Sequence, residues 1–269
     1  MSAAAVGEQE RRADEIGAAS TSHLVLIPSY NTGAKLFETV ASAQSRWRPI
    51  WVVIDGSTDG TGEAIAEWTQ RDPTLRVLCR VENGGKGAAV LDGLRAAESA
   101  GFTHILVMDA DGQHPASAIA QFMALSSDRP GAMILGVPVF DETAPRIRVI
   151  GRKVSNSLAW VESLGEIRDS LFGFRVYPLT PLRRAMEASR FMRRFDFDVE
   201  AVVRLCWDGL PVISVPAPVR YLGADEGGVS HFRYVRDNLL LAGMHARLLA
   251  GFLWRLPRLL ARRLRSSRH

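Results

Sequence analysis

The sequence predicts an α/β fold built on a mixed, mainly parallel sheet that is flanked by helices, with a helical appendage at the C-terminus. Three observations support this fold class. Short aliphatic runs alternate with helical patterns between His23 and residue 137. The runs are apolar on both faces, which is typical of parallel strands that are covered by helices on both sides. Polar loops follow three of the runs, at the strand ends where open α/β sheets bind their ligands.

The first half of the chain is predicted to alternate between strands and helices. The expected strands are residues 24–27, 50–54, 75–78, 105–108 and 133–135. The helices expected between them are residues 34–45, 60–71, 86–99 and 115–126. This alternation favours a parallel sheet whose strands are joined by crossover helices.

The second half is predicted to be less regular. The elements expected there are a helix over 147–164, an extended piece ending at 177–178, a helix over 198–208 and a strand over 211–215. Residues 235–269 have a helical pattern that Pro257 should break, because proline lacks the N–H group that continues a helix.

This pattern divides the chain into three segments. Residues 1–22 lack apolar periodicity, so we expect a disordered leader. A single domain is expected over residues 23–235, with halves over about 23–137 and about 138–235. Residues 236–269 should form basic amphipathic helices.

Composition argues against several classes of protein. Apolar residues make up 47% of the chain and charged residues 23%, so the chain can bury a core. Cys79 and Cys206 are too few and too far apart for a disulfide framework or a zinc cluster, which favours a reducing cytosol. We find no secretory signal, and no uncharged apolar run of the roughly 18 residues that a spanning helix needs. We therefore expect neither a secreted nor an integral membrane protein.

The C-terminal segment is strongly basic, whereas the rest of the chain is mildly acidic. Residues 244–269 contain seven arginines and no acidic residue, and the other 26 basic and 29 acidic residues sum to −3. Beyond Phe252, leucines recur at helical spacing, as in a helix that lies in an anionic membrane surface. For residues 236–250 we favour the alternative, a helix packed across the sheet. The acidic body and the lack of a nucleic-acid module argue against nucleic-acid binding.

Two aspartates follow the fourth predicted strand. Asp109 and Asp111 are separated by one residue, so both carboxylates can face a common point from an extended chain. Hard oxygen ligands at a sheet edge suit Mg²⁺ or Mn²⁺, and Gln113 can add a neutral oxygen. The alternative is a simple turn before the helix that begins near Pro115. The other polar loops at the same edge favour the metal site.

Two further loops are candidates for nucleotide binding. Asp55, at the tip of the second strand, can accept a hydrogen bond from a nucleobase, whereas Ser57 or Thr58 can cap the next helix. Residues 83–87 bring three glycines and Lys86 to a helix start, where backbone amides and an ammonium group can meet a phosphate. The loop has neither Walker nor dinucleotide-binding spacing, so an NTPase or a dehydrogenase is not supported.

In combination, these motifs resemble a known family. The order and spacing of family-2 glycosyltransferases are matched by Ile-Pro-Ser-Tyr-Asn (27–31), Asp-Gly-Ser-Thr-Asp-Gly-Thr (55–61), Asn-Gly-Gly-Lys-Gly-Ala (83–88) and Asp-Ala-Asp-Gly-Gln-His-Pro (109–115). A second set is most similar to the dolichyl-phosphate mannose synthase branch and its bacterial relatives that glycosylate lipids. It consists of residues 152–156, Asp169, residues 173–175, Glu200 and residues 228–231. The resemblance covers about residues 24–235.

The resemblance implies the Rossmann-like GT-A fold and transfer of a sugar from a nucleoside diphosphate, with a divalent metal and inversion at the anomeric carbon. The first half of the domain would bind the donor and the second half the acceptor. The implied donor-binding residues are Pro28, Tyr30, Asn31, Asp55, Lys86 and Asp109. The implied metal ligands are Asp109, Asp111 and Gln113. The implied catalytic residues are Asp169 and Arg175, and Arg152, Ser155 and His231 would contact the acceptor.

Departures from the family pattern leave the base and the acceptor open. Thr32 and Ile54 replace acidic residues on the nucleoside side. Leu171 and Phe172 stand where a small residue is common, which narrows the sugar or acceptor site. His231 replaces a lysine, which removes a permanent charge and favours a hydroxyl acceptor over a lipid phosphate.

The acceptor decides the expected mechanism. A phosphate is already anionic and needs only positioning and charge balance. A hydroxyl needs a general base, and Asp169 is the carboxylate best placed to serve as one. The alternative for Asp169 is a structural salt bridge with Arg168 or Arg175.

The sequence therefore predicts an inverting, metal-dependent glycosyltransferase that uses a UDP- or GDP-linked sugar. Its acceptor would be polyprenyl phosphate or a lipid hydroxyl, at the cytoplasmic face of the cell membrane. A sugar nucleotidyltransferase would need a glycine-rich signature after the first strand, and residues 31–33 are too short for one. A catalytically silent donor-binding scaffold is the other alternative, which Ile54 favours and the intact aspartates oppose.

Overall fold

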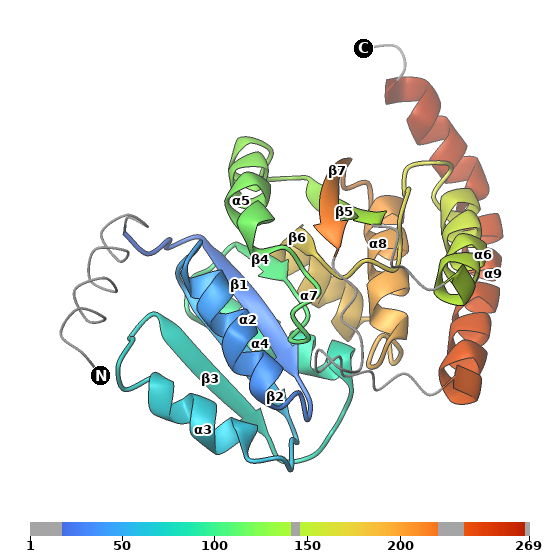
Figure 1. Cartoon of the computed structure of the whole chain (residues 1–269). Helices are drawn as coiled ribbons and strands as arrows, with labels where there is room; N and C mark the ends of the chain where they lie inside the picture. The colour runs from blue at the N-terminus through green and yellow to red at the C-terminus, as the bar shows by residue number, and fades with distance from the viewer. Residues whose placement is uncertain (1–17, 141–145, 220–233, 267–269) are drawn as a thin grey trace.

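A seven-stranded sheet in the order β3-β2-β1-β4-β6-β5-β7 forms the centre of the molecule (Figure 1). The computed structural model describes residues 18–140, 146–219 and 234–266. The strands are β1 (His23–Ser29), β2 (Ile50–Asp55), β3 (Leu75–Arg80), β4 (His104–Val107), β5 (Met133–Phe140), β6 (Arg175–Pro178) and β7 (Val212–Val219). The α-helices are α2 (Ala34–Gln44), α3 (Thr61–Trp68), α4 (Lys86–Ser99), α5 (Ile119–Asp128), α6 (Arg146–Glu162), α7 (Leu179–Glu187), α8 (Asp196–Asp208) and α9 (Tyr234–Ser266).

The predicted mixed, mainly parallel sheet is confirmed. Strands β1 to β4 pair in parallel, and β5 pairs in parallel with β7. Strand β6 lies between β4 and β5 and is antiparallel to both. The carboxyl ends of β1, β2 and β4 therefore meet at one edge of the sheet, and the predicted polar loops leave from that edge.

The central strands β1, β2 and β4 bury residues on both faces of the sheet, and helices cover both faces. Leu24 and Leu26 of β1 belong to the core beneath α4, α7, α8 and α9. Val25 and Ile27 belong to the core beneath α2, α3 and α5. All four side chains are fully buried, which explains why the predicted strands are apolar on both faces.

Two local features differ from the expectation. The sequence pattern predicted no helix between residues 178 and 198, whereas α7 forms there with Pro181 in its first turn, where proline is tolerated. The predicted break near Pro257 is absent, since α9 runs through this residue. Pro257 is exposed, so the carbonyl that loses its N–H partner lies on the solvent side of the helix.

Helix α9 is a candidate membrane span, whereas the sequence pattern predicted none. In the part of the chain that the structure describes, Arg236–Arg265 is long and apolar enough to cross a membrane by length and composition. The sequence pattern did not indicate this because arginines interrupt the apolar run. Only 22% of the most apolar window is buried inside the protein, so most of this helix surface faces outward.

Candidate functional site

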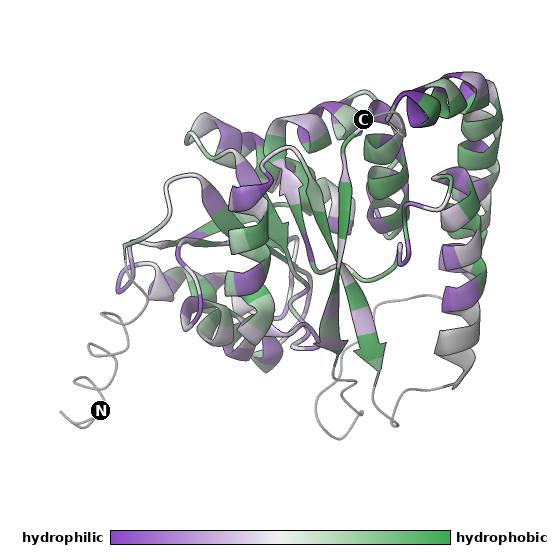
Figure 2. Ribbon diagram, turned by 90° about the horizontal axis from the view of Figure 1, so that it is seen from above, coloured by the Kyte–Doolittle hydropathy of each residue, from purple (hydrophilic) through white to green (hydrophobic). Residues whose placement is uncertain are grey.

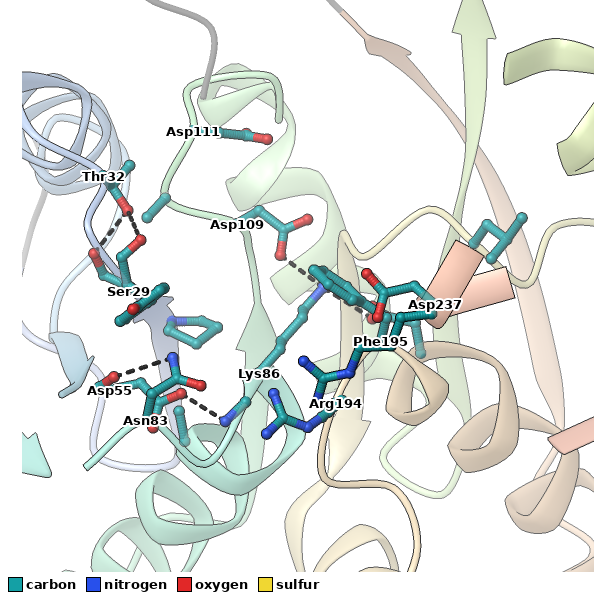
Figure 3. A pocket seen from close by; sticks show the side chains of 18 of the residues that line it. Ser29, Thr32, Asp55, Asn83, Lys86, Asp109, Asp111, Arg194, Phe195 and Asp237 are labelled. Atoms are coloured by element: carbon teal, nitrogen blue, oxygen red, sulfur yellow. Dashed lines mark hydrogen bonds and ion pairs between the residues drawn. The ribbon is translucent and has the colours of Figure 1, made fainter. Parts of the chain in front are cut away.

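A cavity of about 550 Å³ opens at the carboxyl ends of β1, β2 and β4 (Figure 3). The predicted site residues in its wall are Pro28, Tyr30, Asp55, Lys86, Asp109 and Asp111. Predicted site residues outside the wall are Asn31, Gln113, Arg152, Ser155, Asp169 and Arg175. His231 lies outside the described residues. The structure thus brings the expected donor-side residues together, whereas those expected at the acceptor lie elsewhere.

Asn31 joins the loops after β1 and β2. Its backbone N–H donates to the Ser57 hydroxyl at 3.0 Å, and its side-chain oxygen accepts from the Thr58 N–H at 2.7 Å. The Asp59 carboxylate accepts from the Gly33 N–H at 3.0 Å, which makes a second link between the same loops. Asn31 therefore fixes the wall that carries Pro28 and Tyr30.

Asp55 organises the glycine-rich loop between β3 and α4. Its carboxylate accepts hydrogen bonds from the Gly84 N–H at 3.0 Å and the Gly85 N–H at 2.7 Å. Arg80 forms an ion pair with the same carboxylate at 2.8 Å. The aspartate expected to meet a nucleobase thus holds the Lys86 loop in place while it lines the cavity.

Lys86 lies between two carboxylates at the floor of the cavity. Its ammonium is 2.6 Å from Asp109 Oδ1 and 2.8 Å from Asp198 Oδ2. Burial would lower the pKa of Lys86, but Asp109 and Asp198 outweigh this effect and raise it. Burial would likewise raise the pKa of Asp109, but the Lys86 ammonium holds it below its usual value. Lys86 and Asp109 are therefore both charged at neutral pH, and the Lys86 ammonium forms ion pairs with the Asp109 and Asp198 carboxylates.

His114 contacts both the backbone and the side chain of Asp109 and so positions it. Its Nδ1 accepts the Asp109 backbone N–H at 2.9 Å, so the ring proton of the neutral imidazole is on Nε2. Nε2 lies 3.5 Å from Asp109 Oδ2, and the ring packs edge-on against Phe172. Burial lowers the pKa of His114 to about 4, so the ring is neutral at physiological pH. The histidine of the 109–115 motif thus has a positioning role that the sequence did not suggest.

Asp111 is the carboxylate at this edge that suits a cation. Burial, together with the neighbouring Asp109 charge, raises the pKa of Asp111 to about 6. Its Oδ1 accepts the Gln113 backbone N–H at 3.0 Å, and no described lysine, arginine or histidine pairs with it. Within the described ranges no group of three or more His, Cys, Asp and Glu side chains could enclose a metal. A divalent ion bound here would need oxygens from a ligand, as Mg²⁺ and Mn²⁺ sites for diphosphates commonly do.

Asp169 is held by five hydrogen bonds and does not line the cavity. Arg152 donates to both of its oxygens, at 2.9 and 2.6 Å, and Asn156 donates at 2.7 Å. The Leu171 and Phe172 N–H groups donate at 3.0 and 2.8 Å. The salt bridge considered for Asp169 therefore exists, but its partner is Arg152 and not Arg168 or Arg175. Arg152 is therefore engaged by Asp169 and is not among the residues that line the cavity.

Arg175 and Ser155 are also committed to internal contacts. Arg175 is fully buried and donates to the Tyr177 hydroxyl at 3.2 Å and to the Asp198 backbone oxygen. The Ser155 hydroxyl lies 2.8 Å from His245 Nε2. This contact joins α6 to α9, so Ser155 ties two helices together.

One wall of the cavity comes from segments that no motif indicated. Arg194, Phe195 and Asp198 approach from the start of α8, and Asp237 and Leu241 approach from α9. Figure 3 shows Arg194, Phe195 and Asp237 on the side opposite Ser29 and Thr32. The one signal in the sequence was the acidic first turn of α8, since a buried aspartate at a helix start usually has a partner.

Comparison with known proteins identifies the family. The sequence pattern of glycosyl transferase family 2 matches residues 24–186, so the chain belongs to this family and is a glycosyltransferase. The chain is similar to polyprenol monophosphomannose synthase of Mycolicibacterium smegmatis, with 27% identity over 255 residues, 90% of this chain and 96% of the relative. It is also similar to undecaprenyl-phosphate mannosyltransferase of Micrococcus luteus, with 26% identity over 203 residues, 72% of this chain and 81% of the relative.

Solved structures agree on the fold. Glucosyl-3-phosphoglycerate synthase from Mycobacterium tuberculosis, crystallised with Mn²⁺, UDP and glucosyl-3-phosphoglycerate, superposes with a TM-score of 0.54 at 18% identity. The match covers 93% of this chain and 83% of that protein. The predicted GT-A fold is thereby confirmed.

Proposed function

We propose that the protein transfers a sugar from a UDP- or GDP-linked donor to the phosphate of a polyprenyl lipid, with Mg²⁺ or Mn²⁺ and inversion at the anomeric carbon. The cavity has the size of a nucleotide-sugar site and lies where GT-A folds bind ligands. The names of the two relatives, a polyprenol monophosphomannose synthase and an undecaprenyl-phosphate mannosyltransferase, support a prenyl phosphate acceptor.

The observation that carries this proposal is the engagement of Asp169. Both of its oxygens already accept hydrogen bonds, and two come from Arg152, so it is poorly placed to remove a proton. Asp109 and Asp198 are likewise paired with Lys86. A phosphate acceptor is already anionic and needs no base, whereas a hydroxyl acceptor does. This arrangement favours the phosphate among the two acceptors that the sequence left open.

In the proposed reaction, an acceptor phosphate oxygen bonds to the anomeric carbon as the bond from that carbon to the diphosphate breaks. Pro28 and Tyr30 would bind the nucleoside, and Asp109 and Asp111 would hold the divalent ion. The ion would neutralise the charge of the departing diphosphate. Lys86 holds Asp109 through an ion pair, and His114 keeps Asp109 in position through the aspartate's backbone N–H.

An assay of sugar transfer by the purified protein tests this function. The purified protein should move labelled sugar from GDP-mannose or UDP-glucose to undecaprenyl phosphate in the presence of Mn²⁺, and EDTA should stop the transfer. Undecaprenol without the phosphate should be inert, since Asp169, the base that the sequence offered for a hydroxyl acceptor, is engaged by Arg152. Equal transfer to undecaprenol and its phosphate would contradict the proposed acceptor.

Helices α6 and α9 offer a surface for the membrane that would supply such an acceptor. They pack side by side, and hydrophobic segments lie along this outer edge (Figure 2). Val154 and Trp160 of α6 are 61% and 55% exposed, and Leu253 and Trp254 of α9 are 59% and 81% exposed. Residues 146–161 and 238–266 contain basic residues but no acidic ones. This combination favours reversible binding to an anionic lipid surface.

The membrane assignment predicts the behaviour of a surface variant. Replacing Leu253, Trp254 and Leu264 with serine should weaken binding to phosphatidylglycerol vesicles at least about tenfold, because it removes apolar side chains that would enter the interface. Flotation with these vesicles measures the effect, and added salt should weaken binding of the unchanged protein. Truncation is a poorer test, because Arg262 donates to the Trp207 and Cys206 carbonyls that end α8.

The control for this variant is nucleotide binding, which should stay unchanged. A variant that still floats with the vesicles would contradict the membrane role of α9.

We place the protein at the cytoplasmic face of the membrane, in agreement with its two free cysteines.

A further inference from the structure

Two arginines line the cavity on the wall that the sequence motifs did not indicate. Arg194 comes from the loop before α8, and Arg236 comes from the first turn of α9. In the described part of the chain, no carboxylate or carbonyl group pairs with either guanidinium group. Figure 3 shows Arg194 on the same side of the cavity as Lys86. Lys86 differs from both arginines, because Asp109 and Asp198 neutralise its charge.

The loop that presents Arg194 is fixed by its neighbours. The Asp196 carboxylate accepts the Met192 N–H at 3.0 Å and the Arg194 N–H at 2.9 Å. Arg193 donates to the Ser189 and Phe191 carbonyls at 3.0 and 2.8 Å. The side chains before and after Arg194 thus hold the backbone, while the Arg194 guanidinium is left for the cavity. A loop whose backbone is already fixed loses little further freedom when its side chain binds a ligand.

Close packing brings this loop against the start of α4. A Cβ atom at Gly85 would lie 2.6 Å from the Arg193 carbonyl oxygen and 2.7 Å from Arg194 Cγ. The Ala88 N–H donates to the Arg193 carbonyl at 3.0 Å. Gly85, with a φ of 96°, therefore serves the approach of the Arg194 loop. Lys86 and Arg194 are held at the same part of the cavity as a result.

The surroundings of the arginines are partly apolar. Phe195, Leu171 and Leu241 line the same cavity, and Leu241 lies on α9 one turn beyond Arg236. Asp237 lines this wall as well. Two arginines in a cavity that also has apolar side chains match a phosphate that is attached to an organic group. Guanidinium groups suit phosphate because their planar N–H donors match its oxygens.

We propose that Arg194 and Arg236 together form a phosphate-binding subsite in this cavity, with Arg194 as its principal donor. The inference rests on the proposed function, because that function supplies two phosphates, the lipid monophosphate and the donor diphosphate. It departs from the sequence expectation, which gave the acceptor phosphate to Arg152 and Ser155. Arg152 is engaged by Asp169 and Ser155 by His245, so neither reaches the cavity in this structure.

Binding measurements on Arg194→Met and Arg236→Met test the subsite. The probes are GDP and UDP with Mn²⁺, and separately geranyl phosphate, each titrated by calorimetry. Arg194→Met should lose about 10-fold or more in affinity for at least one class of probe, since a charge-assisted hydrogen bond contributes about 1.5–3 kcal/mol. Arg236→Met should weaken the same probe, and Arg194→Lys should retain part of the affinity.

The matched control is Arg184→Met, which removes the same charge from an exposed position on α7 outside the cavity. It should bind all probes as the unchanged protein does. A loss confined to geranyl phosphate would assign the subsite to the acceptor, and a loss confined to GDP or UDP would assign it to the donor. Unchanged affinity of Arg194→Met for both classes would overturn the proposal. A protein that binds these probes normally but transfers no sugar would contradict the proposed function, not the subsite.

Discussion

Replacing Asp111 with asparagine should abolish the Mn²⁺-dependent part of nucleotide binding while the fold stays intact. Asparagine keeps the shape of the side chain, and it can still accept the Gln113 N–H bond at 3.0 Å. It removes the carboxylate that no described basic side chain neutralises, and so removes the charge that a divalent ion requires. We expect GDP or UDP affinity measured by calorimetry to become insensitive to Mn²⁺, with a loss of about 100-fold or more at saturating metal, the upper range for a lost charged contact.

The pH dependence of Mn²⁺ binding gives a second readout of the same site. The pKa of Asp111 is raised to about 6, so its carboxylate is ionised above this pH and becomes protonated as the pH falls below it. Mn²⁺ affinity of the unchanged protein should therefore fall as the pH drops through 6, up to about tenfold per pH unit for one competing proton.

The control for both readouts is Asp128→Asn, at an exposed position near the end of α5. It should keep the metal dependence and the pH profile of the unchanged protein. If Asp111→Asn binds nucleotide with normal Mn²⁺ dependence, the loop after β4 does not hold the metal.

The donor side of the molecule was the more predictable part. Strands such as β1 are buried on both faces, so their sequences are apolar throughout and easy to identify. Asp55 is the last residue of β2 and Asp109 comes two residues after β4, which places both at the sheet edge without any knowledge of distant contacts. Strand β6 was less predictable, because its antiparallel position depends on pairing with β4 and β5 and not on its own four residues.

The cavity wall that carries Arg194 and Asp198 was less predictable, because it is formed by tertiary packing. The glycines of residues 83–87 suggested a phosphate cradle, but Gly85 also admits the loop that carries Arg194. No short motif connects that loop to α4, since the two segments are more than a hundred residues apart. Asp198 is another example, because its role depends on Lys86 reaching it from another helix. Such contacts can be recognised only when the fold has brought the segments together.

Asp169→Asn should destabilise the protein by about 3 kcal/mol, because it leaves the guanidinium of a largely buried ion pair without its partner. Asp169 is 5% exposed, and Arg152 donates to both of its oxygens. The asparagine amide would also turn an N–H₂ group toward one of the donors Arg152 and Asn156. Chemical denaturation measures this loss, and turnover is then compared per folded molecule.

A second substitution separates a structural Asp169 from a catalytic one. The double variant Arg152→Met/Asp169→Asn removes both charges, so its stability should recover relative to Asp169→Asn alone. A general base would behave differently: Asp169→Asn would keep normal stability, lose about 10²-fold in turnover and gain nothing from the Arg152 substitution. That second pattern would restore the hydroxyl acceptor and overturn the argument for a phosphate, because the argument rests on the hydrogen bonds that occupy both Asp169 oxygens.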